Sequence, residues 1–276
     1  TARNEADEAL LLATVLREAV EEGQTASLVS PDRTLARRVA VDLARWGIVV
    51  DDSAGRPLDQ TPPAVLASLA ARLALRGLEP VDLLSLLKHP LCRLGLSVKD
   101  VRSAARALER GVLRGPRAAP GTSGLAAAVA ASRAEHSSKE AREERIPRWK
   151  KLVEDDWAAV EDLVSKLCEA LKPLEDFAQV SGEIAVEALV EAHVECLARL
   201  SVDETGSCDE LYAGETGDQL ARTLSDMLEV KGSGLCLPAF DWPDVFAAFL
   251  SGINVRRRLP GDPRISILGP LEARLH

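Results

Sequence analysis

The sequence predicts an α/β protein that is mostly helical. Both ends of the chain form a small parallel sheet, and a large helical domain is inserted between them. Three observations lead to this fold class: residues 5–50 alternate helical and strand-like patterns, residues 62–251 carry helical patterns with almost no strand signal, and one strand-like run follows at residues 265–268. Because the α/β signal is confined to the two ends, the simplest architecture is an interrupted α/β domain.

The first α/β segment reads as helix, strand, helix and strand. Residues 5–22 place alanines, leucines and valines near one helical face, with acids in the first turn and Gly23 after the last. Residues 26–30 read as a short buried strand, residues 33–46 as a second helix and residues 48–50 as a second strand. Two short strands joined by a helix are expected to be parallel.

The middle of the chain reads as a helical block. Thr61 followed by two prolines is a typical helix start, and prolines, including Pro173, are expected to punctuate the helices that follow. The expected helices are 62–76, 80–88, 97–110, 123–144, 147–171, 182–200, 217–230 and 242–251. The Gly- and Pro-rich stretch 111–124 is expected to be a loop. The resulting domain boundaries are 1–60, 61–254 and 255–276.

Composition limits the classes of function. The chain has 276 residues, with 34 Lys and Arg against 43 Asp and Glu, for a net charge of −9, which excludes a uniformly basic nucleic-acid coat. Aromatic residues make up 3% of the chain, which argues against an aromatic base-stacking platform. Five separated cysteines, no signal-like start and no long apolar run favour a reduced, cytoplasmic protein without membrane contact. Both ends look cut, so we expect a piece of a larger protein.

Charge is distributed unevenly along the chain. Residues 88–117 carry eight basic and two acidic side chains, whereas residues 152–230 carry 20 acids and four bases. Within the basic segment an arginine recurs every four residues, which on one helix makes a slanted stripe. Guanidinium groups suit phosphates, so we expect this stripe to be a DNA-binding site. The alternatives are a solvated face or pairing with the acidic segment. The stripe consists of Arg102, Arg106, Arg110 and Arg114.

Other constellations carry weaker signals. His193 and Cys196 have metal-ligand spacing but lack a second pair, so a buried cysteine beside a surface histidine is the favoured interpretation. The side chains of the consecutive residues Glu154, Asp155 and Asp156 would point in different directions on a helix, so we interpret this run as a solvated helix face. The sequence has no GxxxxGK[ST] phosphate loop, and it has no GxSxG or HExxH motif. We therefore expect no catalytic residue, no metal site and no cofactor in this chain.

Several stretches resemble a known family. Residues 5–9, 26–33 and 35–39 resemble the second motor domain of UvrD-type superfamily 1 DNA helicases, a RecA-like domain called 2A with a mostly helical insertion called 2B. The AddB subunit family of bacterial AddAB helicase–nucleases is a more specific match. Residues 30–63, 83–95 and 267–276 carry that likeness. The resemblance implies that 1–60 is part of 2A, 61–254 a 2B-like insertion, and 255–276 a returning strand that leads into motif V.

In this family motif V approaches nucleotide and DNA. The resemblance places its turn at residues 269–274, with Gly269, Glu272 and Arg274 as nucleotide-site or motif V-like residues. Only Leu271 and Glu272 match the end of the usual histidine–serine–lysine–glycine–leucine–glutamate pattern. This departure argues against an ATP-driven motor. It is consistent with AddB-type subunits, whose motor domains resemble a helicase but serve as a DNA-scanning scaffold.

The resemblance also implies a function for the intact parent. That parent would be an ATP-dependent helicase–nuclease subunit that processes DNA ends in double-strand break repair and recombination, with DNA and an AddA-like subunit as partners. ATP, Mg²⁺ and an iron–sulphur cluster are implied for the intact family only, and this part would give DNA and subunit contacts. The alternatives are an ATPase motor fragment of a true superfamily 1 helicase and a helical protein-binding scaffold.

Overall fold

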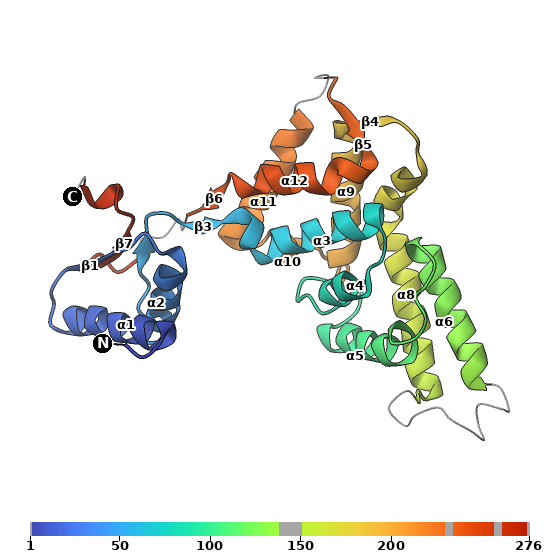
Figure 1. The fold of residues 1–276 in the computed structure, drawn as a ribbon, viewed down its shortest axis with the longest axis horizontal. Coiled ribbons are helices and arrows are strands. Elements are labelled where there is room, and N and C mark those ends of the chain that lie inside the picture. The colour runs from blue at the N-terminus through green and yellow to red at the C-terminus, as the bar shows by residue number, and fades with distance from the viewer. Residues whose placement is uncertain (1, 138–150, 230–233, 257–260, 275–276) are drawn as a thin grey trace. The chain divides into compact units, whose positions relative to one another are not determined.

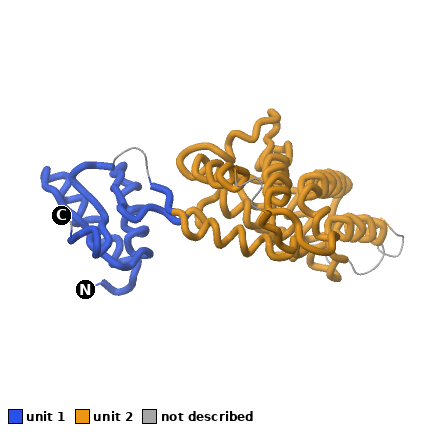
Figure 2. The backbone as a smooth tube through the Cα atoms, turned by 90° about the horizontal axis from the view of Figure 1, so that it is seen from above, with its two compact units in different colours: residues 1–57, 254–276 blue, residues 58–253 orange. Residues whose placement is uncertain are grey.

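The chain forms two compact units in the computed structural model, which describes residues 2–137, 151–229, 234–256 and 261–274. Unit 1 comprises residues 1–57 and 254–276, and unit 2 comprises residues 58–253 (Figure 2). The boundaries expected after residues 60 and 254 lie within three residues of these limits. Unit 1 is therefore assembled from both ends of the chain, and unit 2 is continuous.

Unit 1 contains a three-stranded parallel sheet in the order β1-β7-β2. Figure 1 shows β1 and β7 side by side. The strand contributed by the C-terminal segment thus lies between the two N-terminal strands. With the helical unit 2, this sheet confirms the predicted fold class, α/β and mostly helical. The unit 1 elements are α1 (Glu5–Glu21), β1 (Ala26–Val29), α2 (Arg33–Arg45), β2 (Asp51–Asp52) and β7 (Ile265–Leu268).

The second strand differs from its expected position. Residues 48–50 have no strand structure, and the ladder begins one residue later, where Asp51 pairs with Ser266 and Asp52 with Ile267. Of this apolar triplet, Val50 belongs to the core at 8% exposed, whereas Val49 is 38% exposed. The paired residues themselves are acidic because β2 is an edge strand whose outer side faces solvent.

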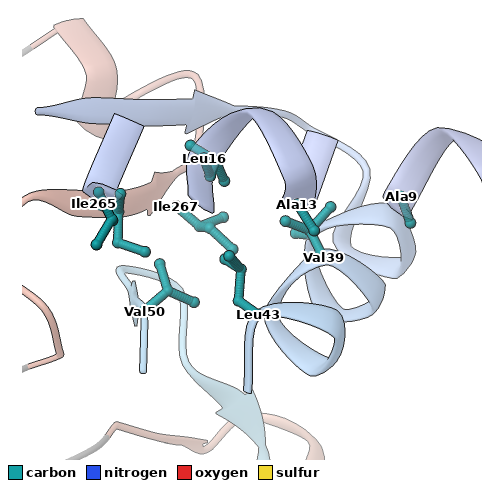
Figure 3. Close-up of a cluster of buried hydrophobic side chains, with 10 residues drawn as sticks. Ala9, Ala13, Leu16, Val39, Leu43, Val50, Ile265 and Ile267 are labelled. Carbon is teal, nitrogen blue, oxygen red and sulfur yellow. The ribbon is translucent and has the colours of Figure 1, made fainter. Parts of the chain in front are cut away.

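The core of unit 1 lies on one face of the sheet. Side chains from α1, α2 and β7 meet there in an apolar cluster (Figure 3). On the opposite face Ser27 and Ser266 are paired across β1 and β7, with 2.8 Å between their hydroxyl oxygens, and Val29 is 50% exposed. Parallel sheets are usually covered on both faces, so this open face is unusual. The labelled core residues are Ala9, Ala13, Leu16, Val39, Leu43, Val50, Ile265 and Ile267.

A short antiparallel ribbon carries the chain out of unit 1 and back. β3 (Arg56–Pro57) pairs with β6 (Asn254–Val255), with Arg56 opposite Val255. Gly55 precedes β3 with a φ of +67°, and a Cβ atom there would lie 2.6 Å from the Val255 carbonyl oxygen. This position therefore requires glycine both for its backbone conformation and for the close approach of the two strands.

Unit 2 is a helical body in which α8 packs against α9, α6, α5 and α3. Helices α3 and α12 have the expected bounds, the other expected helices differ at their ends, and the short helix α10 was not expected. The described helices are α3 (Pro62–Arg76), α4 (Pro80–Leu87), α5 (Val98–Leu108), α6 (Gly121–Ser137), α8 (Glu154–Glu175), α9 (Val186–Ser201), α10 (Asp209–Tyr212), α11 (Gly214–Glu229) and α12 (Trp242–Ser251). Residues 138–144, 147–150 and 230 of the expected helices lie outside the described residues.

Two further features of unit 2 were not expected. Pro173 does not end a helix, because α8 continues to Glu175. A proline has no N–H to bond the carbonyl four residues earlier, and here the Arg199 guanidinium donates to that Glu169 carbonyl oxygen at 2.7 Å. A short antiparallel ladder also joins β4 (Glu183–Ala185) to β5 (Cys236–Pro238).

The expected loop 111–124 is shorter than predicted. Its first residues belong to a π-helical turn, Glu109–Leu113, and its last residues, from Gly121, begin α6. Gly111 is buried, and a Cβ atom there would lie 2.6 Å from Leu152 Cδ1. The absent side chain at Gly111 therefore lets Leu152 pack closely against this turn.

We expect Ile267→Ala to destabilise unit 1 selectively. Ile267 is fully buried in the middle strand, and deleting such a side chain costs about 2–5 kcal/mol of unfolding free energy. Urea unfolding, followed by hydrogen exchange of the α1 and α2 amides, measures the loss. Val41→Ala is the control, since Val41 is 58% exposed and should change stability by about 0.5 kcal/mol or less. Equal effects of the two substitutions would contradict the assigned core.

Candidate functional site

The predicted basic stripe begins on α5. Ser97 caps the helix by accepting a hydrogen bond from the Asp100 amide at 3.2 Å, and this fixes where the first turn begins. The inner face buries Val101, Ala105 and Leu108 against neighbouring helices. The outer face is therefore left to charged side chains, as the amphipathic pattern predicts.

The four arginines do not share one helix. Arg102 and Arg106 are exposed on α5, which ends at Leu108. Arg110 lies in the π-helical turn and Arg114 directly after it. The regular four-residue step that predicted one continuous stripe therefore stops where the backbone changes from α to π geometry.

Carboxylates hold the second pair of arginines. Arg114 lies 2.7 Å from Glu109, which also contacts Lys88 at 3.1 Å, and these hydrogen bonds lower the pKa of the Glu109 carboxyl. Arg110 is 3.9 Å from Asp156 of α8, so the acidic segment reaches one member of the stripe. Pairing with the acidic segment was the structural alternative for this stripe. Arg110 makes that contact, whereas Arg114 pairs with Glu109 of the basic segment itself.

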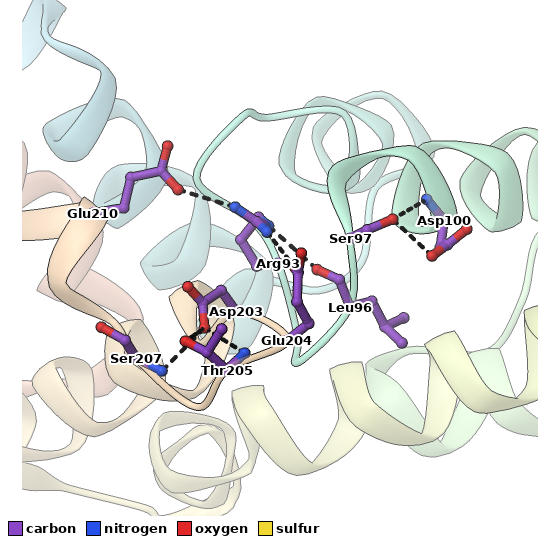
Figure 4. Close-up of polar contacts among 9 residues, drawn as sticks. All are labelled: Arg93, Leu96, Ser97, Asp100, Asp203, Glu204, Thr205, Ser207 and Glu210. Carbon is purple, nitrogen blue, oxygen red and sulfur yellow. Dashed lines mark hydrogen bonds and ion pairs between the residues drawn. The ribbon is translucent and has the colours of Figure 1, made fainter.

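Arg93, another cation of the basic segment, is also neutralised locally. Its guanidinium lies 2.5 Å from Glu204 and 3.0 Å from Glu210, and its Nε donates to the Leu96 carbonyl (Figure 4). The Arg93–Glu204 ion pair links the loop after α4 to the loop after α9, and the Arg93 side chain is only 13% exposed. Arg93 therefore supports the fold of unit 2 and offers little charge to a ligand.

Three cations on α5 stay available. Lys99, Arg102 and Arg106 are spaced i, i+3 and i+7, which places them on one exposed helical face. Within the described residues, no carboxylate lies within 4.0 Å of any of them. We call these three residues the α5 basic face. The four-residue step leaves out Lys99, although the i, i+3, i+7 spacing could have identified it. Such a face can donate hydrogen bonds to phosphate oxygens.

The motif V-like turn follows β7 at the carboxyl edge of the sheet. The Ala273 amide donates to the Gly269 carbonyl at 3.0 Å, and the Arg274 amide donates to the Leu271 carbonyl at 3.2 Å within a short 3₁₀ helix, Glu272–Arg274. Glu272 folds back over Gly269, where a Cβ atom would lie 2.4 Å from the carboxylate. Arg274 is exposed. The turn therefore brings Gly269 and Glu272 together, whereas Arg274 points to solvent.

An ion pair also lies at the carboxyl edge of the unit 1 sheet. Arg33, the first residue of α2, donates from Nη2 to both carboxylate oxygens of Asp52 at 2.5 and 2.6 Å. Asp52 ends β2, so this contact links the segments that follow the two outer strands. Arg33 Nη1 and Ser53 Oγ are buried and have no hydrogen-bond partner in the described part of the chain. No sequence motif singles out these residues.

His193 belongs to the core of unit 2. It is fully buried rather than on the surface as expected, with Nε2 3.0 Å from the Ala67 carbonyl oxygen and Nδ1 accepting from Trp242 Nε1 at 3.3 Å. Burial lowers the His193 pKa to about 4 and raises the pKa of buried Cys196 to about 12. Both contacts of the neutral ring are structural, so this pair is part of the core.

The remaining acidic candidates lie on the surface. Glu154 and Asp155 are exposed, and Glu154 pairs with Arg133 of α6. No group of three or more His, Cys, Asp or Glu side chains within the described ranges could hold a metal ion. Among the helices described, none is long and apolar enough to cross a membrane.

Comparisons with known proteins add no assignment. No protein-family model matches the sequence, and no curated protein matches it.

Acid should destabilise unit 2 through His193. The unfolded histidine has a pKa near 6.5 and the folded one about 4, so only the unfolded state takes up a proton between these values. The unfolding free energy should therefore fall as the pH drops from about 6.5 to about 4, by about 3 kcal/mol at most. Urea unfolding against pH measures this loss, and His193→Gln should flatten the slope. If the variant does not fold, NMR titration of the native ring serves, and ionisation near pH 6.5 would contradict the assignment.

Proposed function

We propose that the chain is part of an AddB-like subunit of a bacterial helicase–nuclease that processes DNA ends in double-strand break repair and recombination, with an AddA-like partner. Unit 1 corresponds in this proposal to a partial RecA-like 2A domain and unit 2 to its 2B-like insertion. The observation that carries the proposal is the chain order, in which all of unit 2 lies between β2 and β7. This is the arrangement that the sequence resemblance implies.

The open sheet face of unit 1 also supports this proposal. Ser27, Val29 and Ser266 lie on the face opposite the α1–α2 core, and no helix of the described residues covers them within unit 1. A parallel sheet of a RecA-like domain needs cover on both faces. A larger subunit or a partner subunit would supply it.

The contribution of this part of the subunit would be contact with DNA. The α5 basic face offers three cations without carboxylate partners among the described residues, and no aromatic side chain lies on α5. Such a face suits the sugar–phosphate backbone and not the bases, so binding would be sequence-tolerant and salt-dependent.

We expect Arg102→Ala/Arg106→Ala to weaken DNA binding and its salt dependence together. Removing one phosphate contact lowers the slope of log affinity against log salt by about 0.7 for single strands and about 0.9 for duplex, so removing two should lower it by about 1.4–1.8. Fluorescence anisotropy of labelled DNA across a salt series gives the slope. The outcome that rules out the proposed contact is an unchanged slope in this variant.

Lys166→Ala/Lys172→Ala is the matched control for charge. These lysines pair with Asp162 and Asp176, so the control removes the same net charge from a site with its own carboxylates. It should leave the slope unchanged. If the unsubstituted chain binds no DNA even at low salt, the protein-binding scaffold becomes the better interpretation.

The chain should hydrolyse no ATP, with or without DNA. It contains no GxxxxGK[ST] loop, and the Arg33–Asp52 ion pair occupies the sheet edge at which open α/β sheets take ligands. A phosphate-release assay with the purified chain and excess DNA measures this. DNA-stimulated release that Arg33→Ala abolishes would instead support the ATPase motor alternative.

A further inference from the structure

An exposed aromatic ring in unit 2 is held in a fixed position. Phe240 lies in the 3₁₀ turn Ala239–Asp241 after β5, and it is 60% exposed. The Arg76 guanidinium carbon lies 4.8 Å from its ring centroid. Arg76 also donates from Nε to the Phe240 carbonyl at 3.0 Å and from its two other nitrogens to Asp244 at 3.0 and 2.6 Å. One side of the ring is therefore fixed by a stacked cation, while most of its surface faces solvent.

The elements beside this ring carry an exposed apolar side chain and exposed carboxylates. Val180 is 50% exposed at the end of the 3₁₀ helix 176–179, which packs beside the turn that carries Phe240. Asp241 and Asp244 are exposed just after the ring in sequence, and exposed Glu183 pairs in the β4–β5 ladder with Pro238, two residues before the ring. We call this surface, made of Phe240 and Val180 with these three carboxylates, the Phe240 platform.

The charge of the Phe240 platform determines which partner it suits. Arg76 and Asp244 neutralise each other, so the exposed charges that remain on the described residues of the platform are the carboxylates of Asp241 and Glu183, which repel the phosphates of a nucleic acid. A pre-fixed aromatic side chain loses little entropy on binding and is a frequent anchor of protein interfaces. We propose that the Phe240 platform docks a protein segment in which an apolar side chain is flanked by lysines or arginines. This inference does not depend on the DNA function proposed above.

Fluorine NMR of the whole chain tests the proposal. The chain contains four phenylalanines, so fluorophenylalanine incorporation gives four resonances that single substitutions assign. The probe is a short synthetic peptide in which leucines alternate with lysines. We expect it to shift the Phe240 resonance saturably and to leave that of Phe249, which is 48% exposed on α12, in place. The same peptide with glutamate for lysine should shift neither.

Two variants separate the outcomes. Asp241→Asn should weaken peptide binding about three-fold, as removal of one exposed charge pair does, whereas Asp155→Asn on α8 should not change it. Equal shifts at Phe240 and Phe249, or equal affinities of the two variants, would overturn the proposal. A shift of the Phe240 resonance by oligothymidine and not by the lysine peptide would overturn it in favour of a base-stacking surface.

Discussion

The middle position of β7 in the three-stranded sheet is the constraint on which the rest of the chain depends. β1 and β2 contact β7 and not each other, so neither N-terminal strand has a partner until residues 265–268 are in place. Ile265 and Ile267 also complete the apolar cluster that α1 and α2 cover. All of unit 2 therefore lies in the chain between β2 and β7, and the β3–β6 ribbon pairs the outgoing and returning segments.

The distribution of charge separates cations that hold unit 2 together from cations available to a ligand. Arg93, Arg110 and Arg114 each lie beside a carboxylate, whereas the α5 basic face has no such neighbour among the described residues. The acidic excess of residues 152–230 thus acts partly inside the fold. The carboxylates exposed around Phe240 give unit 2 a second surface, of the opposite charge. DNA contact and subunit contact are consistent with such a division.

Hydrophobic periodicity in the sequence was enough to predict most of the helices. Features that depend on a single contact between distant residues could not be predicted from it. The bounds of α3 and α12 follow from prolines in the first turn, glycines after the last turn and apolar spacing. The continuation of α8 past Pro173 depends on a distant arginine, Arg199, and no local pattern reports it. The four arginines do not lie on one regular helix for a related reason, since the π-helical turn after Leu108 changes the geometry on which the four-residue step relied. The burial of His193 likewise depends on Trp242, 49 residues away in sequence.

The central claim is that both ends of the chain form one cooperative sheet around β7. Native-state hydrogen exchange tests it most directly, because amides that open together share one opening free energy. The account predicts that the hydrogen-bonded amides of Ala26–Val29 and Ile265–Leu268 exchange with a common free energy, and that Ile267→Ala lowers it for both strands equally. Protection of the β1 amides with rapid, independent exchange of the β7 amides would contradict the account.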